Sequence, residues 1–107
     1  MIVFHLSDHT PEIFRMFDAN AEKGLTAVAL QAERHAKEAC PVRTGRLKGS
    51  ITHAVMPKVA IIGTNVEYGP YVEFGTSKQK AKPFLRPAAE NYTAEYRAIL
   101  QRYLQGS

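Results

Sequence analysis

The 107-residue sequence has a single cysteine and no apolar run long enough to span a membrane. One thiol cannot form an intramolecular disulfide, and a chain without disulfides suits a reducing compartment. Cys40 stands directly before Pro41, where a long apolar stripe ends, so we expect a structural thiol there rather than a nucleophile. The apolar run Met1–Leu6 is interrupted by His5 and is too short for a signal peptide. We therefore expect a cytoplasmic chain with no membrane contact.

The usual catalytic and metal-binding patterns are also missing. The four histidines show neither HExxH nor Cys/His metal spacing. No glycine-rich phosphate loop follows a predicted strand, and there is no Gly-x-Ser-x-Gly elbow. Glu67 and Glu73 form a conceivable carboxylate pair, but their positions around Gly69 and Pro70 favour solvated or salt-bridged side chains. We therefore expect no enzymatic activity, no cofactor and no metal ion.

Charge is present but unevenly distributed. The net charge is +4, yet the stretch from Pro41 to Pro87 has eight basic and two acidic residues, which give +6, and the flanks together carry −2. The eight basic residues are Arg43, Arg46, Lys48, Lys58, Lys78, Lys80, Lys82 and Arg86. Such a segment can face nucleic acid, lie in solvent or meet an acidic neighbouring subunit, and solvated loops are the commonest case. No aromatic residue lies among the three loop lysines, which argues against reading of a nucleic-acid sequence.

The length and the patterns predict one α+β domain over residues 1–107. A short strand is expected at Ile2–Leu6. Thr10-Pro11-Glu12 is typical of a helix start, and apolar residues at spacings of three and four predict a long amphipathic helix from there to Ala39. Small residues in its second half predict close packing, and Gly24 is a weak point where the helix can kink.

The second half of the chain predicts a small antiparallel sheet with a central hairpin, followed by a C-terminal helix. The hairpin comprises a strand at Leu47–Val55, a turn at Met56–Lys58 and a strand at Val59–Gly63. The remaining elements are a short helix around residues 68–74 that Gly75 closes, a basic loop at Ser77–Lys82, a short strand at Pro83–Leu85 and a final helix opened by Pro87. A strand is the alternative to the short helix, although Gly69-Pro70 weakens it.

Several of these residues have a structural and a functional interpretation. Tyr68, Tyr71 and Phe74 suit a core edge or an interface equally well. Arg86 can pair with Glu73 or with a neighbouring subunit. The lysine-bearing loop lies between two apolar anchors, and we expect it to reach an adjacent subunit or a DNA channel.

Three ordered segments resemble the sequence signature of a known family. They are Cys40–Ile51 (CPVRTGRLKGSI), Gly63–Thr76 (GTNVEYGPYVEFGT) and Lys82–Ala88 (KPFLRPA). This pattern is similar to that of a phage tail-component family named after the tenth gene product of a lambdoid phage of the HK series. Arg43 departs from the family, which frequently has an acid at that position, so an acidic contact does not transfer to this chain.

The resemblance implies a virion structural protein at the neck or upper tail, a minor tail component that completes the tail or joins it to the head. It also implies a homo-oligomeric ring, contacts with neighbouring neck and tail proteins, non-specific contact with DNA in the channel, and assembly in the host cytoplasm. A small basic nucleic-acid-binding accessory protein is the alternative. The candidate interface or DNA-channel residues are Arg43, Arg46, Lys48, Tyr68, Tyr71, Glu73, Phe74, Lys78, Lys80, Lys82 and Arg86.

Overall fold

A computed structural model of the chain describes residues 2–6, 19–41, 45–56 and 59–104. The molecule is elongated, with extents of 48 × 21 × 20 Å. Its elements in chain order are β1 (Ile2–Leu6), α2 (Ala19–Ala39), α3 (Arg46–Ser50), β2 (Thr52–Met56), β3 (Val59–Thr64), α4 (Gly69–Phe74), α5 (Leu85–Glu90) and α6 (Thr93–Leu104). The predicted α+β class with a small antiparallel sheet is confirmed.

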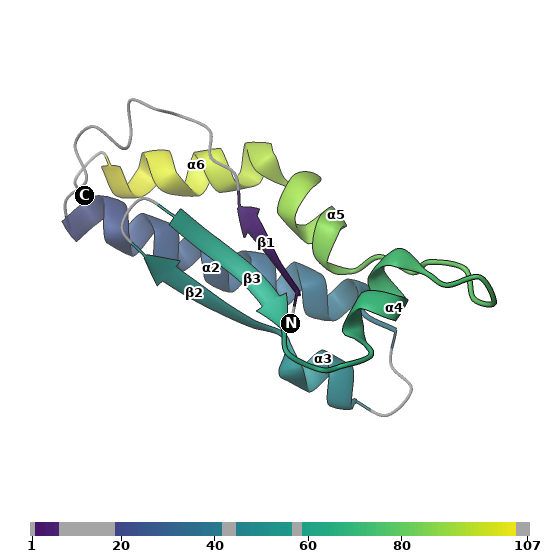
Figure 1. The fold of residues 1–107 in the computed structure, drawn as a ribbon. Helices are drawn as coiled ribbons and strands as arrows, with labels where there is room; N and C mark the ends of the chain where they lie inside the picture. The colour runs from purple at the N-terminus through teal and green to yellow at the C-terminus, as the bar shows by residue number, and fades with distance from the viewer. Residues whose placement is uncertain (1, 7–18, 42–44, 57–58, 105–107) are drawn as a thin grey trace.

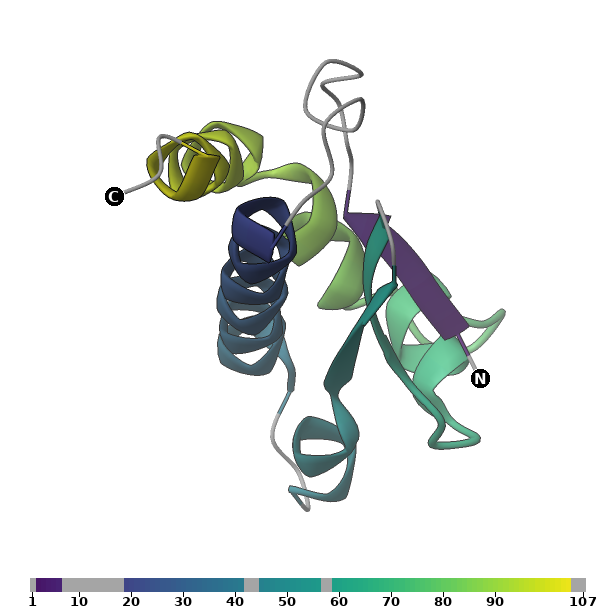
Figure 2. The same ribbon diagram turned by 90° about the vertical axis from the view of Figure 1, so that its left-hand side faces the viewer.

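The sheet has three strands in the order β1-β3-β2, and both pairings are antiparallel. Ile62 on the central strand lies opposite Phe4 on one side and His53 on the other. Because side chains alternate along a strand, these three residues share the face that the helices cover. Figures 1 and 2 show α2, α5 and α6 on this side of the sheet. The predicted strand at residues 2–6 and the predicted antiparallel hairpin are therefore confirmed, while residues 57 and 58 of its turn lie outside the described residues.

The core forms where α2 packs against the sheet and against α5 and α6. Ala29, Ala32 and Ala36 on α2 are fully buried, as are Ile62 and Phe84. The three alanines have small side chains, so α2 approaches its neighbours closely, as the sequence predicted. Large side chains from the other elements fill the remaining space.

Helix α2 is continuous through Gly24, where the sequence allowed a kink. A Cβ at this position would stand 3.1 Å from Leu100 Cδ2 and 3.2 Å from Tyr103 Cβ, so the glycine lets α6 pack closely against α2. The described helix begins at Ala19. The predicted start at Thr10–Glu12 lies outside the described residues.

The predicted strand over Leu47–Val55 is wrong in its first half, which is the short helix α3. Gly45 adopts φ +79°, a left-handed conformation that turns the chain into this helix. The Gly49 amide then donates to the Gly45 carbonyl at 2.8 Å, and the Ser50 hydroxyl donates to the Leu47 carbonyl at 2.6 Å. Local hydrogen bonds therefore satisfy this segment, and only Thr52–Met56 joins the sheet.

The predictions for the last quarter of the chain also need correction. Pro83–Leu85 is not a strand, because Phe84 is the N-cap of helix α5 and Leu85 is its first residue. Pro87 lies in the first turn of α5, where its missing N–H leaves no helical hydrogen bond unmade. The single predicted C-terminal helix is interrupted after Glu90, and α6 starts at Thr93. The Tyr96 hydroxyl donates to the Ala88 carbonyl at 2.5 Å and so links the two helices across this break.

Candidate interaction surface

The chain between α4 and α5 extends from one end of the elongated molecule, as Figure 1 shows in green. We call residues 75–83 the basic loop, and α3, residues 67–74, this loop and Arg86 together the basic end. The predicted short helix is confirmed as α4, with Pro70 in its first turn and Gly75 at its C-cap. Lys78, Lys80 and Lys82 are all exposed on the basic loop. Within the described residues, none of the three forms an ion pair.

Hydrogen bonds hold the basic loop in one shape. Gly75 has φ +80°, which favours glycine, and a Cβ there would stand 2.8 Å from the Ala81 amide nitrogen. The Thr76 amide donates to the Gln79 carbonyl at 2.9 Å, and the Thr76 hydroxyl oxygen accepts from the amides of Lys78 and Gln79. The Lys82 amide donates to the Val72 carbonyl at 2.8 Å and closes the loop against α4.

Glu73 fastens the base of the basic loop, which corrects its predicted role as a solvated or salt-bridged acid. Its side chain is buried, with 3% of its surface exposed. One carboxylate oxygen accepts from the amides of Phe84 (3.0 Å) and Leu85 (2.8 Å), and the other accepts from Arg86 (3.1 Å). Amides at the start of a helix have no hydrogen-bond acceptor within the helix, so Glu73, eleven positions before Phe84, caps α5. Both carboxylate oxygens are therefore directed at backbone amides rather than into solvent.

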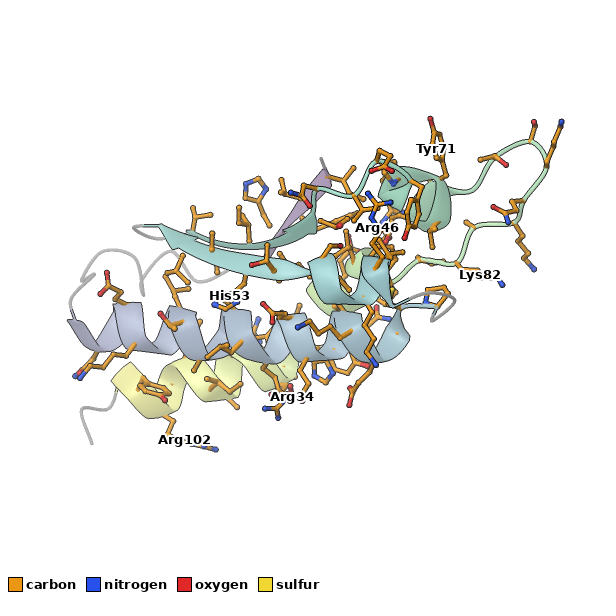
Figure 3. All side chains as sticks on the ribbon, turned by 90° about the horizontal axis from the view of Figure 1, so that it is seen from below. Arg34, Arg46, His53, Tyr71, Lys82 and Arg102 are labelled. Carbon is orange, nitrogen blue, oxygen red and sulfur yellow. The ribbon has the colours of Figure 1, made fainter. Side chains whose placement is uncertain are left out.

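The aromatic residues of α4 divide between the two predicted roles. Tyr68 is half-buried, with the Arg46 guanidinium 5.4 Å from its ring centroid. Tyr71 and Phe74 are 59% and 53% exposed, the two most exposed aromatic side chains of the described residues. Figure 3 shows Tyr71 pointing outward from α4. Exposed aromatic area of this kind favours an interface for Tyr71 and Phe74.

Arg86 stacks on aromatic rings at the same end of the molecule. Its guanidinium carbon is 5.9 Å from the ring centroids of both Phe4 and Phe74, which are 6.3 Å apart. The sequence offers Glu73 or a neighbouring subunit as the partner of the Arg86 side chain. In the structure the Glu73 carboxylate accepts a hydrogen bond from the Arg86 backbone amide instead. Stacking leaves the guanidinium positive and adds it to the charge of the basic end.

Arg46 and Glu67 form an ion pair at the basic end. The guanidinium donates to both carboxylate oxygens, at 3.1 and 3.0 Å. The pKa of Glu67 is lowered by its own backbone amide and by Arg46. Lys48 is exposed on α3, and Arg43 lies outside the described residues. The pairing confirms the salt-bridged interpretation of Glu67.

A cleft of about 440 Å³ lies between α4 and the basic loop. It is lined by Pro41, Tyr68, Tyr71, Val72, Thr76, Gln79, Lys80 and Lys82. The sequence predicted the tyrosines and lysines as interface candidates but missed the other four residues. Pro41 in particular carries no signal of its own, because only the fold brings the end of α2 next to residues 68–82.

His35 lies on α2, Cys40 directly follows that helix, and His53 on β2 faces it. His53 contacts Glu33 at 2.7 Å, and His35 stacks on Tyr92 with its ring nitrogen 2.8 Å from Glu95. Burial raises the pKa of the Cys40 thiol, which suits the predicted structural role. In the part of the chain that the structure describes, no group of three potential metal ligands gathers, and no helix is long and apolar enough to cross a membrane.

These features define a small α+β protein with exposed aromatic and positively charged side chains at one end. Residues 11–75 match the model of the family described as "Bacteriophage HK97-gp10, putative tail-component", and the chain belongs to this family of phage tail components. The match includes the first of the three segments that carry the resemblance and nearly all of the second, while Lys82–Ala88 lies beyond it. No curated protein and no solved structure matches the chain.

Proposed function

We propose that the chain is a non-enzymatic structural subunit of a tailed-phage virion, assembled in the host cytoplasm as a homo-oligomeric ring at the neck or upper tail. There it completes the tail or joins it to the head. Membership in the tail-component family carries this proposal, and it makes other phage proteins the natural partners. The basic end supplies the contact surface, because its aromatic and cationic side chains are directed outward rather than into the core.

A ring around the DNA path gives the uneven charge a purpose. The middle of the sequence carries +6, and the three loop lysines have no ion-pair partner among the described residues. A surface of this kind either tolerates passing phosphate groups or binds an acidic neighbour. The same feature favours the alternative function, a small accessory protein that binds nucleic acid.

The two functions differ in how the isolated chain behaves. The accessory protein should bind duplex DNA with an affinity that falls steeply as salt rises, because each neutralised phosphate releases a counterion. The structural subunit should bind DNA weakly and form rings as its concentration rises. Native mass spectrometry at several concentrations, beside a salt-titrated DNA-binding assay, separates them. Tight, salt-sensitive binding by a monomer would overturn the structural proposal.

Complementation tests the role of the basic loop in the virion. A phage lacking this gene is supplied with the chain carrying Lys78→Glu, Lys80→Glu and Lys82→Glu. The matched control carries Lys23→Glu, Arg34→Glu and Arg97→Glu, which reverses three exposed charges on α2 and α6. Figure 3 shows Arg34 directed away from the sheet. We expect infectious particles to fall sharply for the loop variant alone, and unchanged titres would refute a role for the loop.

A further inference from the structure

We propose that the cleft between α4 and the basic loop binds an acidic peptide segment of a neighbouring protein, one in which a carboxylate stands beside a large apolar side chain. The proposed function makes this neighbour a virion protein, and in that respect the inference rests on it. The cleft itself is argued from its shape, its order and its charge.

The shape suits side chains of a peptide. A volume of about 440 Å³ lies within the range of roughly 300–1,000 Å³ that is typical of ligand sites. Pro41, Val72 and the rings of Tyr68 and Tyr71 form its apolar lining. A duplex presents convex, charged strands and cannot use such an apolar lining, whereas a peptide can insert one apolar side chain into it.

The cleft is ordered before any partner arrives. The basic loop forms one wall of the cleft. It is held to α4 by the hydrogen bond from the Lys82 amide to the Val72 carbonyl, and the first amides of α5 donate to the Glu73 carboxylate. The bonds around Thr76 fix the turn between these points. Because ordering a loop on binding costs affinity, a wall that is already fixed favours recognition of a short segment.

Charge selects an acidic partner. Lys80 and Lys82 line the cleft, and Lys78 stands on the same loop. The two acids nearest in sequence are engaged elsewhere, Glu67 with Arg46 and Glu73 with backbone amides. Among the described residues, no acid lines the cleft. A carboxylate on the incoming segment would therefore supply the missing negative charge, and the Thr76 and Gln79 side chains offer further hydrogen-bonding groups beside it.

The chain has no tryptophan, so a probe that contains one can be followed by its own fluorescence. The probe is the capped peptide Gly-Ser-Glu-Trp-Glu-Leu-Gly, titrated with the full-length chain. A second peptide replaces both glutamates with glutamine, and a ten-residue single-stranded oligothymidylate serves as competitor. We expect the acidic peptide to bind with a blue-shifted emission, as its indole leaves water, and the glutamine peptide to bind about tenfold more weakly.

Two double variants localise the binding. Lys80→Glu with Lys82→Glu should weaken the acidic peptide about tenfold or more, since two attractive charges become repulsive. Lys23→Glu with Arg97→Glu makes the same change in net charge on exposed positions of α2 and α6 and should leave affinity unchanged. Equal losses in both variants, no preference for the acidic peptide, or stronger binding of the oligonucleotide at this site would overturn the proposal. If the chain still forms rings while the peptide fails to bind, the inference fails and the structural function stands.

Discussion

The helical body, which comprises the sheet with α2, α5 and α6, and the basic end use the same kinds of residue in opposite ways. In the body, several aromatic and charged side chains are buried or paired within the chain: Phe84 is fully buried, Glu33 contacts both His53 and Lys37, and His35 contacts Glu95. At the basic end, two aromatic rings face solvent and the loop lysines lack an ion-pair partner in the described residues. Since both regions are ordered by hydrogen bonds, the difference is one of purpose: the body stabilises the fold and the end offers a surface.

The sharpest test compares two phenylalanines. Phe84→Ala should destabilise the chain by about 3–5 kcal/mol, because it removes a fully buried ring and leaves a cavity. Phe74→Ala removes a ring that is 53% exposed and should cost about 1 kcal/mol or less. Urea denaturation followed by circular dichroism measures both changes. A similar loss in the two variants would show that the α4 surface is part of the core after all.

The second test asks whether the hydrogen bonds of Glu73 hold the basic loop in place. Glu73→Gln keeps one acceptor oxygen but places an amide group against the backbone N–H of Arg86, so we expect a loss of about 1–3 kcal/mol. Hydrogen exchange should accelerate at residues 84–86 and at Lys82, because the base of the loop opens.

The matched control is Glu67→Gln, which alters an exposed carboxylate of the same end. It should leave both the denaturation midpoint and the exchange of residues 84–86 unchanged, since exposed ion pairs contribute little. If the two glutamine variants behave alike, Glu73 does not clamp the loop.

Two glycine-to-alanine substitutions compare how closely the backbone is packed in the body and at the basic end. Gly63 lies on the central strand, where a Cβ would collide with the Ile2 carbonyl oxygen and stand 2.7 Å from Val3 Cγ1, so Gly63→Ala should destabilise by about 1–3 kcal/mol. At Gly49 in α3 a Cβ meets nothing within 4 Å, and Gly49→Ala should stabilise by about 0.5–1 kcal/mol. Thermal unfolding distinguishes the two signs. A destabilised Gly49 variant would contradict the helical conformation of α3.

Most errors of the sequence-based interpretation lie at or next to the basic end, and the break between α5 and α6 is the exception. Strand β1, the antiparallel pairing and α4 with its closing Gly75 follow from local patterns, and the structure confirms them. Leu47 was assigned to a strand because the apolar pattern did not reveal that Gly45 would start a helical turn.

Glu73 was misjudged for a different reason. Its partners are backbone amides eleven to thirteen residues away, and a backbone amide has no sequence signature. For the same reason the sequence predicted the lysines and tyrosines of the cleft but not its lining by Pro41. The periodicity of the sequence does not reveal hydrogen bonds between distant residues or which distant segments of the chain pack together.

The smallest expected effect is a difference in acid sensitivity between the two regions. Burial raises the pKa of Glu33, but hydrogen bonds and charge from His53 and Lys37 outweigh it, so the pKa lies below its ordinary value of 4.5. A folded-state pKa below the unfolded value stabilises the chain above pH 4.5, and this contribution is lost as pH falls through the lowered pKa. Glu33→Gln should therefore flatten the decline in stability below pH 4.5. Glu67 also has a lowered pKa, but its pair with Arg46 is exposed to solvent, so Glu67→Gln should flatten the decline less. Denaturation midpoints measured from pH 6 downward in about half-unit steps test the order. A larger effect at Glu67 would mean that the basic end, and not the body, depends on its internal ion pair.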